Sequence, residues 1–170
     1  STKMEGNDYL SLIQEGESDY VEFKSSLRWD YHNGNVNKKL EYVITKTVAA
    51  FLNSSGGKLF IGVDDNGEIL GLEKDYKTVK NNNKDGFLLQ LDQIINNYLG
   101  KENHHYISSQ IVKLKDKDVC VIEIINSGQP VYVKSKESGD QEFFVRAAAS
   151  SQPMDMKEAN EYIKHHWANN

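Results

Sequence analysis

The stretch ESDYVEFK at residues 17–24, together with NSSGGKLFIGVDDNGEILG at residues 53–71, decides how this chain is expected to fold. In the first stretch, alternate residues of a short strand point the same way, so Glu22 and Lys24 would share one face while the apolar residues turn to the core. The second stretch predicts a buried strand that ends at two consecutive aspartates. The two segments can therefore bring acidic side chains from separate elements together.

Carboxylates gathered at strand ends beside a lysine could hold a divalent cation against a phosphate group. No histidine or cysteine lies near them in sequence, which favours Mg²⁺ or Mn²⁺ over zinc. Such an ion polarises a phosphoryl oxygen and activates a bound water for attack on phosphorus. A simpler interpretation stays open, in which Glu22 and Lys24 form a surface pair on an edge strand while Asp64 and Asp65 only build a turn.

The composition is that of an ordinary soluble globular protein, with 38% hydrophobic and 26% charged residues. The length suits one domain over residues 1–170, and no apolar run approaches the roughly twenty residues of a membrane span, so no membrane partner is expected. The single Cys120 excludes a disulfide within the chain and fits a cytoplasmic location. A net charge of −5 argues against a broad basic surface that coats nucleic acid, but it leaves local binding open.

Hydrophobic periodicity predicts an α+β fold, with a mixed, mainly antiparallel sheet and packed helices. The main helices are expected at residues 38–53 and 87–99, with a short helix near residues 8–13 and a last one from about residue 155. Strands are expected at residues 20–27, 59–63, 69–72, 107–114, 118–125, 131–134 and 142–146. Residues 73–86 are rich in lysine and asparagine and are predicted to form an exposed connection.

The glycine pair before Lys58 invites an ATP-binding interpretation, which the spacing does not support. A P-loop needs a glycine five residues before its Gly-Lys pair and a helix directly after the lysine. That position is Leu52 here, and a strand is expected to follow Lys58. A tight turn from helix to strand explains Gly56 and Gly57 better.

In this order the segments resemble the Schlafen-type Alba-like domain, also called the divergent AAA domain. The acidic strand comes first, then a helix that ends in AAFLNSSGG, then KLFIGVDDNGEILGL, and later FFVRAAASSQPM with a terminal helix. The resemblance covers nearly the whole chain and implies a single Schlafen-like lobe. Schlafen nuclease cores contain two such lobes, so the resemblance implies a homodimer or one lobe of a longer protein.

The resemblance also implies which residues would form a metal site. In Schlafen nucleases two glutamates and one aspartate form an acidic triad, and the matching positions here are Glu17, Glu22 and Asp65. Asp64 stays possible in place of Asp65. Lys24 would neutralise charge that develops on the phosphate.

Other basic side chains are candidates for contact with nucleic acid, although a scatter of solvated charges is an equal alternative. These candidates are Lys38, Lys39, Lys134, Lys136 and Arg146. Arg146 ends a predicted strand and is the best candidate for a phosphate contact, with a structural ion pair as the alternative.

The sequence therefore predicts a metal-dependent endoribonuclease that acts on RNA or a tRNA-like substrate, with Mg²⁺ or Mn²⁺ as cofactor. A regulatory module that binds nucleic acid, especially DNA, without cutting it is the alternative. A nucleotide sensor is a third reading, which the missing P-loop disfavours. Geometry distinguishes the first two: a nuclease site needs the carboxylates to converge, whereas a Glu22 paired permanently with a buried basic residue would favour binding alone.

Overall fold

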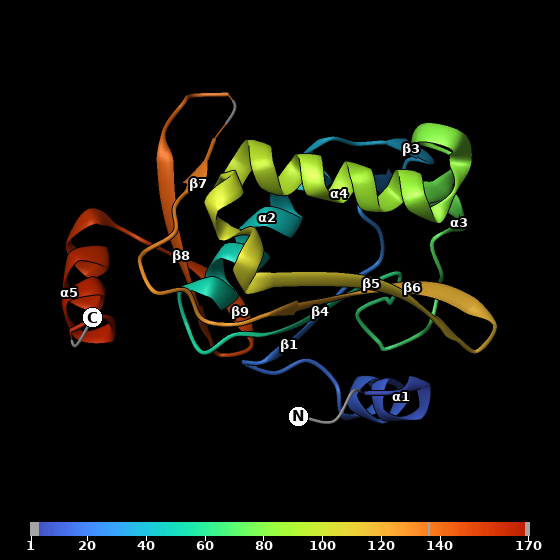
Figure 1. Cartoon of the computed structure of the whole chain (residues 1–170), viewed down its shortest axis with the longest axis horizontal. Helices are drawn as coiled ribbons and strands as arrows, with labels where there is room; N and C mark the ends of the chain where they lie inside the picture. Colours follow the sequence, from blue (N-terminus) through green and yellow to red (C-terminus); the bar gives the residue numbers. More distant parts are fainter. Residues whose placement is uncertain (1–3, 136, 169–170) are drawn as a thin grey trace.

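A four-stranded sheet forms the centre of the computed structural model, which describes residues 4–135 and 137–168 (Figure 1). The sheet order is β1, β4, β6, β5, with β1 and β4 parallel and the other pairs antiparallel. The bounds are Val21–Lys24 for β1, Gly57–Ile61 for β4, Lys117–Ile124 for β6 and Ile107–Leu114 for β5. This confirms the predicted α+β class and the predicted pairing of the first strand with the strand before the aspartates.

Alternation along the strands divides the core into two layers. Leu59 and Ile61 of β4 pack under helices α2 (Lys39–Leu52) and α4 (Lys84–Leu99), while Phe60 faces α1 (Gly6–Glu15) on the other side. β1 follows the same rule, since Phe23 packs against Phe60 and Glu22 takes the opposite face, as predicted. Within residues 4–135 and 137–168, no helix has the length and apolar character that crossing a bilayer requires.

A second, three-stranded sheet covers one end of α2 (Figure 1). It consists of β7 (Val133–Lys134), β8 (Gln141–Ala147) and β9 (Ser150–Met154), and α5 (Met156–His166) follows. β9 was not predicted from the sequence, because its polar residues and Pro153 lack the apolar alternation of a strand. It exists because all five of its residues pair with β8.

The short elements bring two corrections to the sequence analysis. Residues 69–72 do not form the predicted strand, because only Ile69 makes an isolated bridge, to Val63. The segment predicted to be an exposed connection contains α3 (Glu73–Tyr76) and η1 (Lys80–Asn82), and Asp75 within it is buried. The remaining elements are β2 (Trp29–Asp30), β3 (Asn35–Val36) and η2 (Lys101–Tyr106).

The turn from α2 into β4 depends on its two glycines. Gly56 has a φ of +74°, and a Cβ atom at Gly57 would lie 2.4 Å from the ring of Phe51. β4 begins at Gly57, so a strand and not a helix surrounds Lys58. The glycines therefore serve a tight turn, as predicted, and the segment does not have the form of a P-loop.

Two alanines with strained backbone conformations form the turn between β8 and β9, and replacing them should stabilise the protein. Ala148 and Ala149 both have positive φ, 52° and 56°, in a hairpin that Ala147 and Ser150 close. Such turns favour Asn-Gly, because an alanine with positive φ costs about 1 kcal/mol. We expect the double change Ala148→Asn and Ala149→Gly to raise the free energy of unfolding by about 1 kcal/mol in urea denaturation. Ala147→Gly, in the extended strand, should lower it.

Candidate functional site

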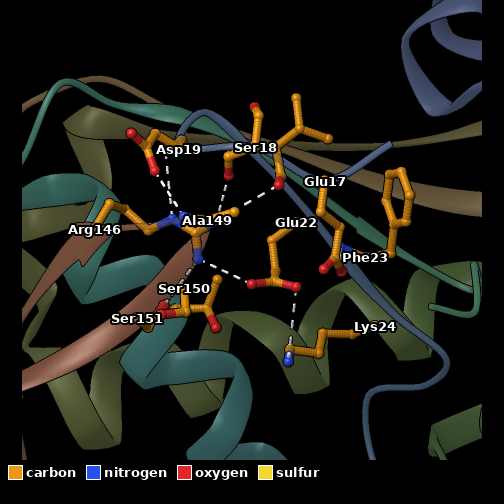
Figure 2. Close-up of polar contacts among 12 residues, drawn as sticks. Glu17, Ser18, Asp19, Glu22, Phe23, Lys24, Arg146, Ala149, Ser150 and Ser151 are labelled. Atoms are coloured by element: carbon orange, nitrogen blue, oxygen red, sulfur yellow. Dashed lines mark hydrogen bonds and ion pairs between the residues drawn. The ribbon is translucent and has the colours of Figure 1, made fainter. Parts of the chain in front are cut away.

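Glu22 is held in an ion pair with a buried arginine. It projects from β1 toward α2 and is 7% exposed, and its Oε1 accepts a hydrogen bond of 2.9 Å from Nη1 of Arg146 on β8 (Figure 2). Its Oε2 lies 4.0 Å from Nζ of Lys24, which remains partly exposed. Burial opposes ionisation of Glu22, but its hydrogen bond with Glu17 and these two cations hold its pKa below the usual value.

Arg146 is surrounded by acceptors. Its guanidinium donates to the carbonyl oxygens of Ser18 at 2.6 Å and Asp19 at 3.3 Å and to Oγ of Ser151 at 3.2 Å, as Figure 2 shows. The group also lies over the ring of Phe51, 4.6 Å from its centroid. With its side chain 1% exposed, Arg146 forms a structural ion pair and does not present its charge to a phosphate. This corrects the expected phosphate contact.

Glu17 lies beside Glu22 and has an unusual proton affinity. Its Oε1 accepts a hydrogen bond of 3.0 Å from the backbone amide of Phe23, and its carboxyl group shares a further hydrogen bond with Glu22. Partial burial, this hydrogen bond and the negative charges of Glu22 and Asp65 raise the pKa of Glu17 to about 7. The pair therefore has an ionised Glu22, with the proton on Glu17 below that pH.

The two aspartates after β4 have different roles. Oδ1 of Asp64 accepts hydrogen bonds of 2.9 Å from the backbone amides of Asn66 and Glu68, so Asp64 builds the turn. Asp65 is exposed and is the aspartate whose charge acts on Glu17. The turn interpretation thus applies to Asp64, and Asp65 is the aspartate whose charge reaches Glu17.

The carboxylates gather but do not form a ready cation site. Across the described ranges, no three acidic, histidine or cysteine side chains are arranged to hold a metal ion. Arg146 occupies Oε1 of Glu22, so an ion would have to use the Oε2 side, near Lys24, or displace the arginine. The donor atoms are nevertheless carboxylate oxygens, which suit Mg²⁺ and Mn²⁺.

A separate basic hollow lies between the start of α2 and α4. It has a volume of about 770 Å³, and its lining includes three cations, Lys38, Lys39 and Arg28, and two carboxylates, Glu41 and Glu137. An adjoining hollow of about 350 Å³ contains Lys134 and shares Asn97 and Tyr98 with the first. Three of the candidate lysines therefore line two adjoining hollows, and Lys136 lies outside the described residues.

The lining also includes residues that the sequence analysis did not select. Gln90, Gln93 and Asn97 lie three and four residues apart on α4, so they share a helix face with each other. Tyr42 and Tyr98 supply aromatic rings. The amide spacing was visible in the sequence, but only the packing of α2 against α4 shows that this face borders a hollow.

The fold and these two sites define an α+β domain with a carboxylate cluster and a separate basic hollow. A model of the Schlafen AlbA_2 family matches residues 17–155, and the chain belongs to this family. The matched residues 17–155 contain the carboxylate cluster, the basic hollow and all the strands from β1 to β9.

Two solved structures share the fold. The DIP2311 protein from Corynebacterium diphtheriae is 20% identical with a TM-score of 0.62, and the alignment covers 94% of this chain and 31% of that protein. The N-terminal domain of a RecG-related protein from Nitrosomonas europaea is 18% identical with a TM-score of 0.52, covering 91% of this chain and 95% of that domain. The chain thus spans about a third of the length of the DIP2311 chain.

The raised pKa of Glu17 implies that the free energy of unfolding depends on pH. Its pKa is about 7 in the folded state and 4.5 in the unfolded state, so its stabilising contribution is complete below pH 4.5 and is lost as the pH rises through 7. Glu17→Gln, which resembles the protonated form, should lose less stability than the unmodified protein between pH 5 and 8 in chemical denaturation. Glu15→Gln, on the exposed end of α1, should leave the pH profile unchanged. A Glu17 carboxyl group that titrates near 4.5 by NMR would contradict the assignment.

Proposed function

We propose that this domain binds nucleic acid along the surface formed by the two adjoining hollows. The observation that carries this proposal is that Lys38 and Lys39 line one hollow and Lys134 lines the adjoining one, although Lys134 is far from the other two in sequence. Arg28 adds a fourth cation, although Glu41 lies 4.0 Å from its Nε and compensates its charge. Local binding of this kind agrees with a net charge of −5, because few phosphates are contacted.

The similar proteins support the same kind of ligand. The name of the RecG-related protein connects it with an ATP-dependent DNA helicase, and its N-terminal domain has the fold of this chain. Membership of the Schlafen AlbA_2 family also points to nucleic acid as the ligand of this domain, and both RNA and DNA are candidates. A homodimer, or a second lobe in a longer protein, would double the number of phosphate contacts and strengthen binding.

The binding proposal predicts a specific loss on charge reversal. Lys38→Glu with Lys39→Glu should weaken binding of single-stranded RNA and DNA at least tenfold by fluorescence anisotropy. The slope of log K against log salt should become shallower by about 0.7 for each lysine, because each releases about one counterion from a single strand.

The matched control is Lys157→Glu with Lys164→Glu on α5, which has the same change in charge on a helix outside the hollows. Binding that weakens equally in both double variants would mean that the overall charge matters and the hollow does not.

Cleavage of phosphodiester bonds is a second candidate, and one observation favours it. Glu17 has a raised pKa in a group of carboxylates, which is typical of sites that await a cation or exchange a proton. We rank cleavage below binding because Glu22 already pairs with the buried Arg146, the arrangement that favours binding alone.

A Mg²⁺ or Mn²⁺ ion would be held by Glu17, Asp65 and the Oε2 side of Glu22. Such an ion supplies stabilisation of charge on phosphate and a more acidic water. Lys24, at the rim, would contact the same phosphate and offset its developing charge. Because Glu17 must lose its proton to bind the ion, the affinity for the ion would rise as the pH increases through 7.

The cleavage candidate can be tested with tRNA, single-stranded RNA and DNA in Mn²⁺, Mg²⁺ or EDTA. If the site is active, Glu17→Gln and Asp65→Asn should each lower the cleavage rate by at least a hundredfold, and EDTA should abolish it. Asp116→Asn, on the exposed turn between β5 and β6, is the control and should cut normally. Cleavage that persists in Glu17→Gln, or in EDTA, would remove this site from consideration.

A further inference from the structure

We propose that the larger hollow is a pocket for one unpaired nucleotide of a strand, with its phosphate at the start of α2 and its base against α4. This inference rests on the proposed binding function and specifies its ligand. The volume of about 770 Å³ lies in the range of pockets that enclose small organic ligands. A surface that only followed a phosphate backbone would need neither this depth nor the aromatic and amide lining described below.

The phosphate end of the pocket is defined by uncompensated charge. Neither Lys38 nor Lys39 belongs to an ion pair within the described part of the chain, and both are exposed. Arg28 differs, because its backbone amide donates to buried Asp75 and its side chain lies beside Glu41. Arg28 is therefore anchored in the wall, while the two lysines are available for a phosphate.

The lining also carries two aromatic rings, Tyr42 from α2 and Tyr98 from α4. The rings of Tyr42 and Tyr98 lie nearly parallel, with an interplanar angle of 10° and centroids 6.3 Å apart. The hydroxyl group of Tyr42 donates to the carboxylate of Glu142 on β8, which fixes the ring of Tyr42. Tyr98 is 8% exposed and stacks on Tyr42, and Nζ of Lys46 lies 6.0 Å from the centroid of the Tyr42 ring, so the half-buried ring of Tyr42 is the part of this wall that a base can contact.

Amide side chains provide partners for the edge of the base. Gln90 is engaged, since its Nε2 donates to Oε2 of Glu41 at 3.1 Å. Gln93 and Asn97 are exposed on the same face of α4, and their side chains make no hydrogen bond to another described residue. An amide both donates and accepts, so it can pair with the polar edge of any base. In a duplex this edge is paired and the base faces are stacked, so only an unpaired nucleotide can use the pocket.

The connection to the second hollow favours a nucleotide within a strand over a free one. Asn97 and Tyr98 line both hollows, and Lys134 lies in the second. A strand whose base occupies the larger hollow can therefore place a neighbouring phosphate near Lys134. A free mononucleotide would leave this second cation unused.

The test compares two RNA hairpins that differ only by one bulged nucleotide, with 5′-AMP as a third probe, in fluorescence anisotropy and competition. We expect the bulged hairpin to bind at least tenfold tighter than the paired hairpin. Gln93→Ala with Asn97→Ala should reduce this ratio to about one. Gln14→Ala on α1, on the other face of the sheet, is the matched amide control and should keep the preference.

A second pair of variants tests the aromatic wall. Tyr42→Leu should lose the preference for the bulge. Tyr42→Phe keeps the ring but loses the hydrogen bond to Glu142, so it should keep part of the preference, and folding of both variants is checked by circular dichroism. Equal affinity for both hairpins, with weaker binding of both after Lys38→Glu and Lys39→Glu, would overturn this inference and leave the proposed function intact. Failure to bind any strand would overturn both. Binding of 5′-AMP as tight as that of the bulged hairpin would reject the assignment to a strand.

Discussion

The buried guanidinium group of Arg146 holds together segments that are distant in sequence. It donates to the backbone before β1 at Ser18 and Asp19 and to Glu22 within β1, and it lies over Phe51 at the end of α2. A buried charge with so many partners is stable only while all of them stay in place, because removing one partner from a buried ion pair typically costs about 3–5 kcal/mol. The approach to β1, the second sheet and α2 therefore depend on one another through this side chain.

The same interaction sets the chemistry of the carboxylate cluster. Because Arg146 and Lys24 stabilise the negative charge of Glu22, the proton shared by the glutamates stays on Glu17. The buried guanidinium group of Arg146 thus lies at one end of the cluster, next to Glu22, whereas Asp65 is exposed to solvent. Glu17 and Glu22 therefore lie together with opposite protonation states, although within the described residues no three such side chains are arranged to hold a metal ion.

The basic hollow is positioned by a different set of contacts. The chain between β1 and α2 is fastened where Asp75 accepts hydrogen bonds from the backbone amides of Leu27, Arg28 and Trp29. This contact places Arg28 in the wall and leads the chain to the lysines at the start of α2. The segment expected to be only an exposed connection therefore orders one side of the proposed binding surface.

The sequence by itself determined the layers of this fold, because alternation in VEFK and KLFI assigns each side chain to one face of the sheet and Gly56-Gly57 requires a tight turn. It also predicted that Glu17 and Glu22 would converge with an aspartate, and of these the two glutamates are hydrogen-bonded neighbours. Only the tertiary structure decided that Asp64 builds the turn, that β9 forms by pairing with β8, and that Lys38 and Lys134 border adjoining hollows. The pairing of Glu22 with Arg146 spans 124 residues, and such contacts follow from how whole elements pack, which local pattern and propensity do not encode.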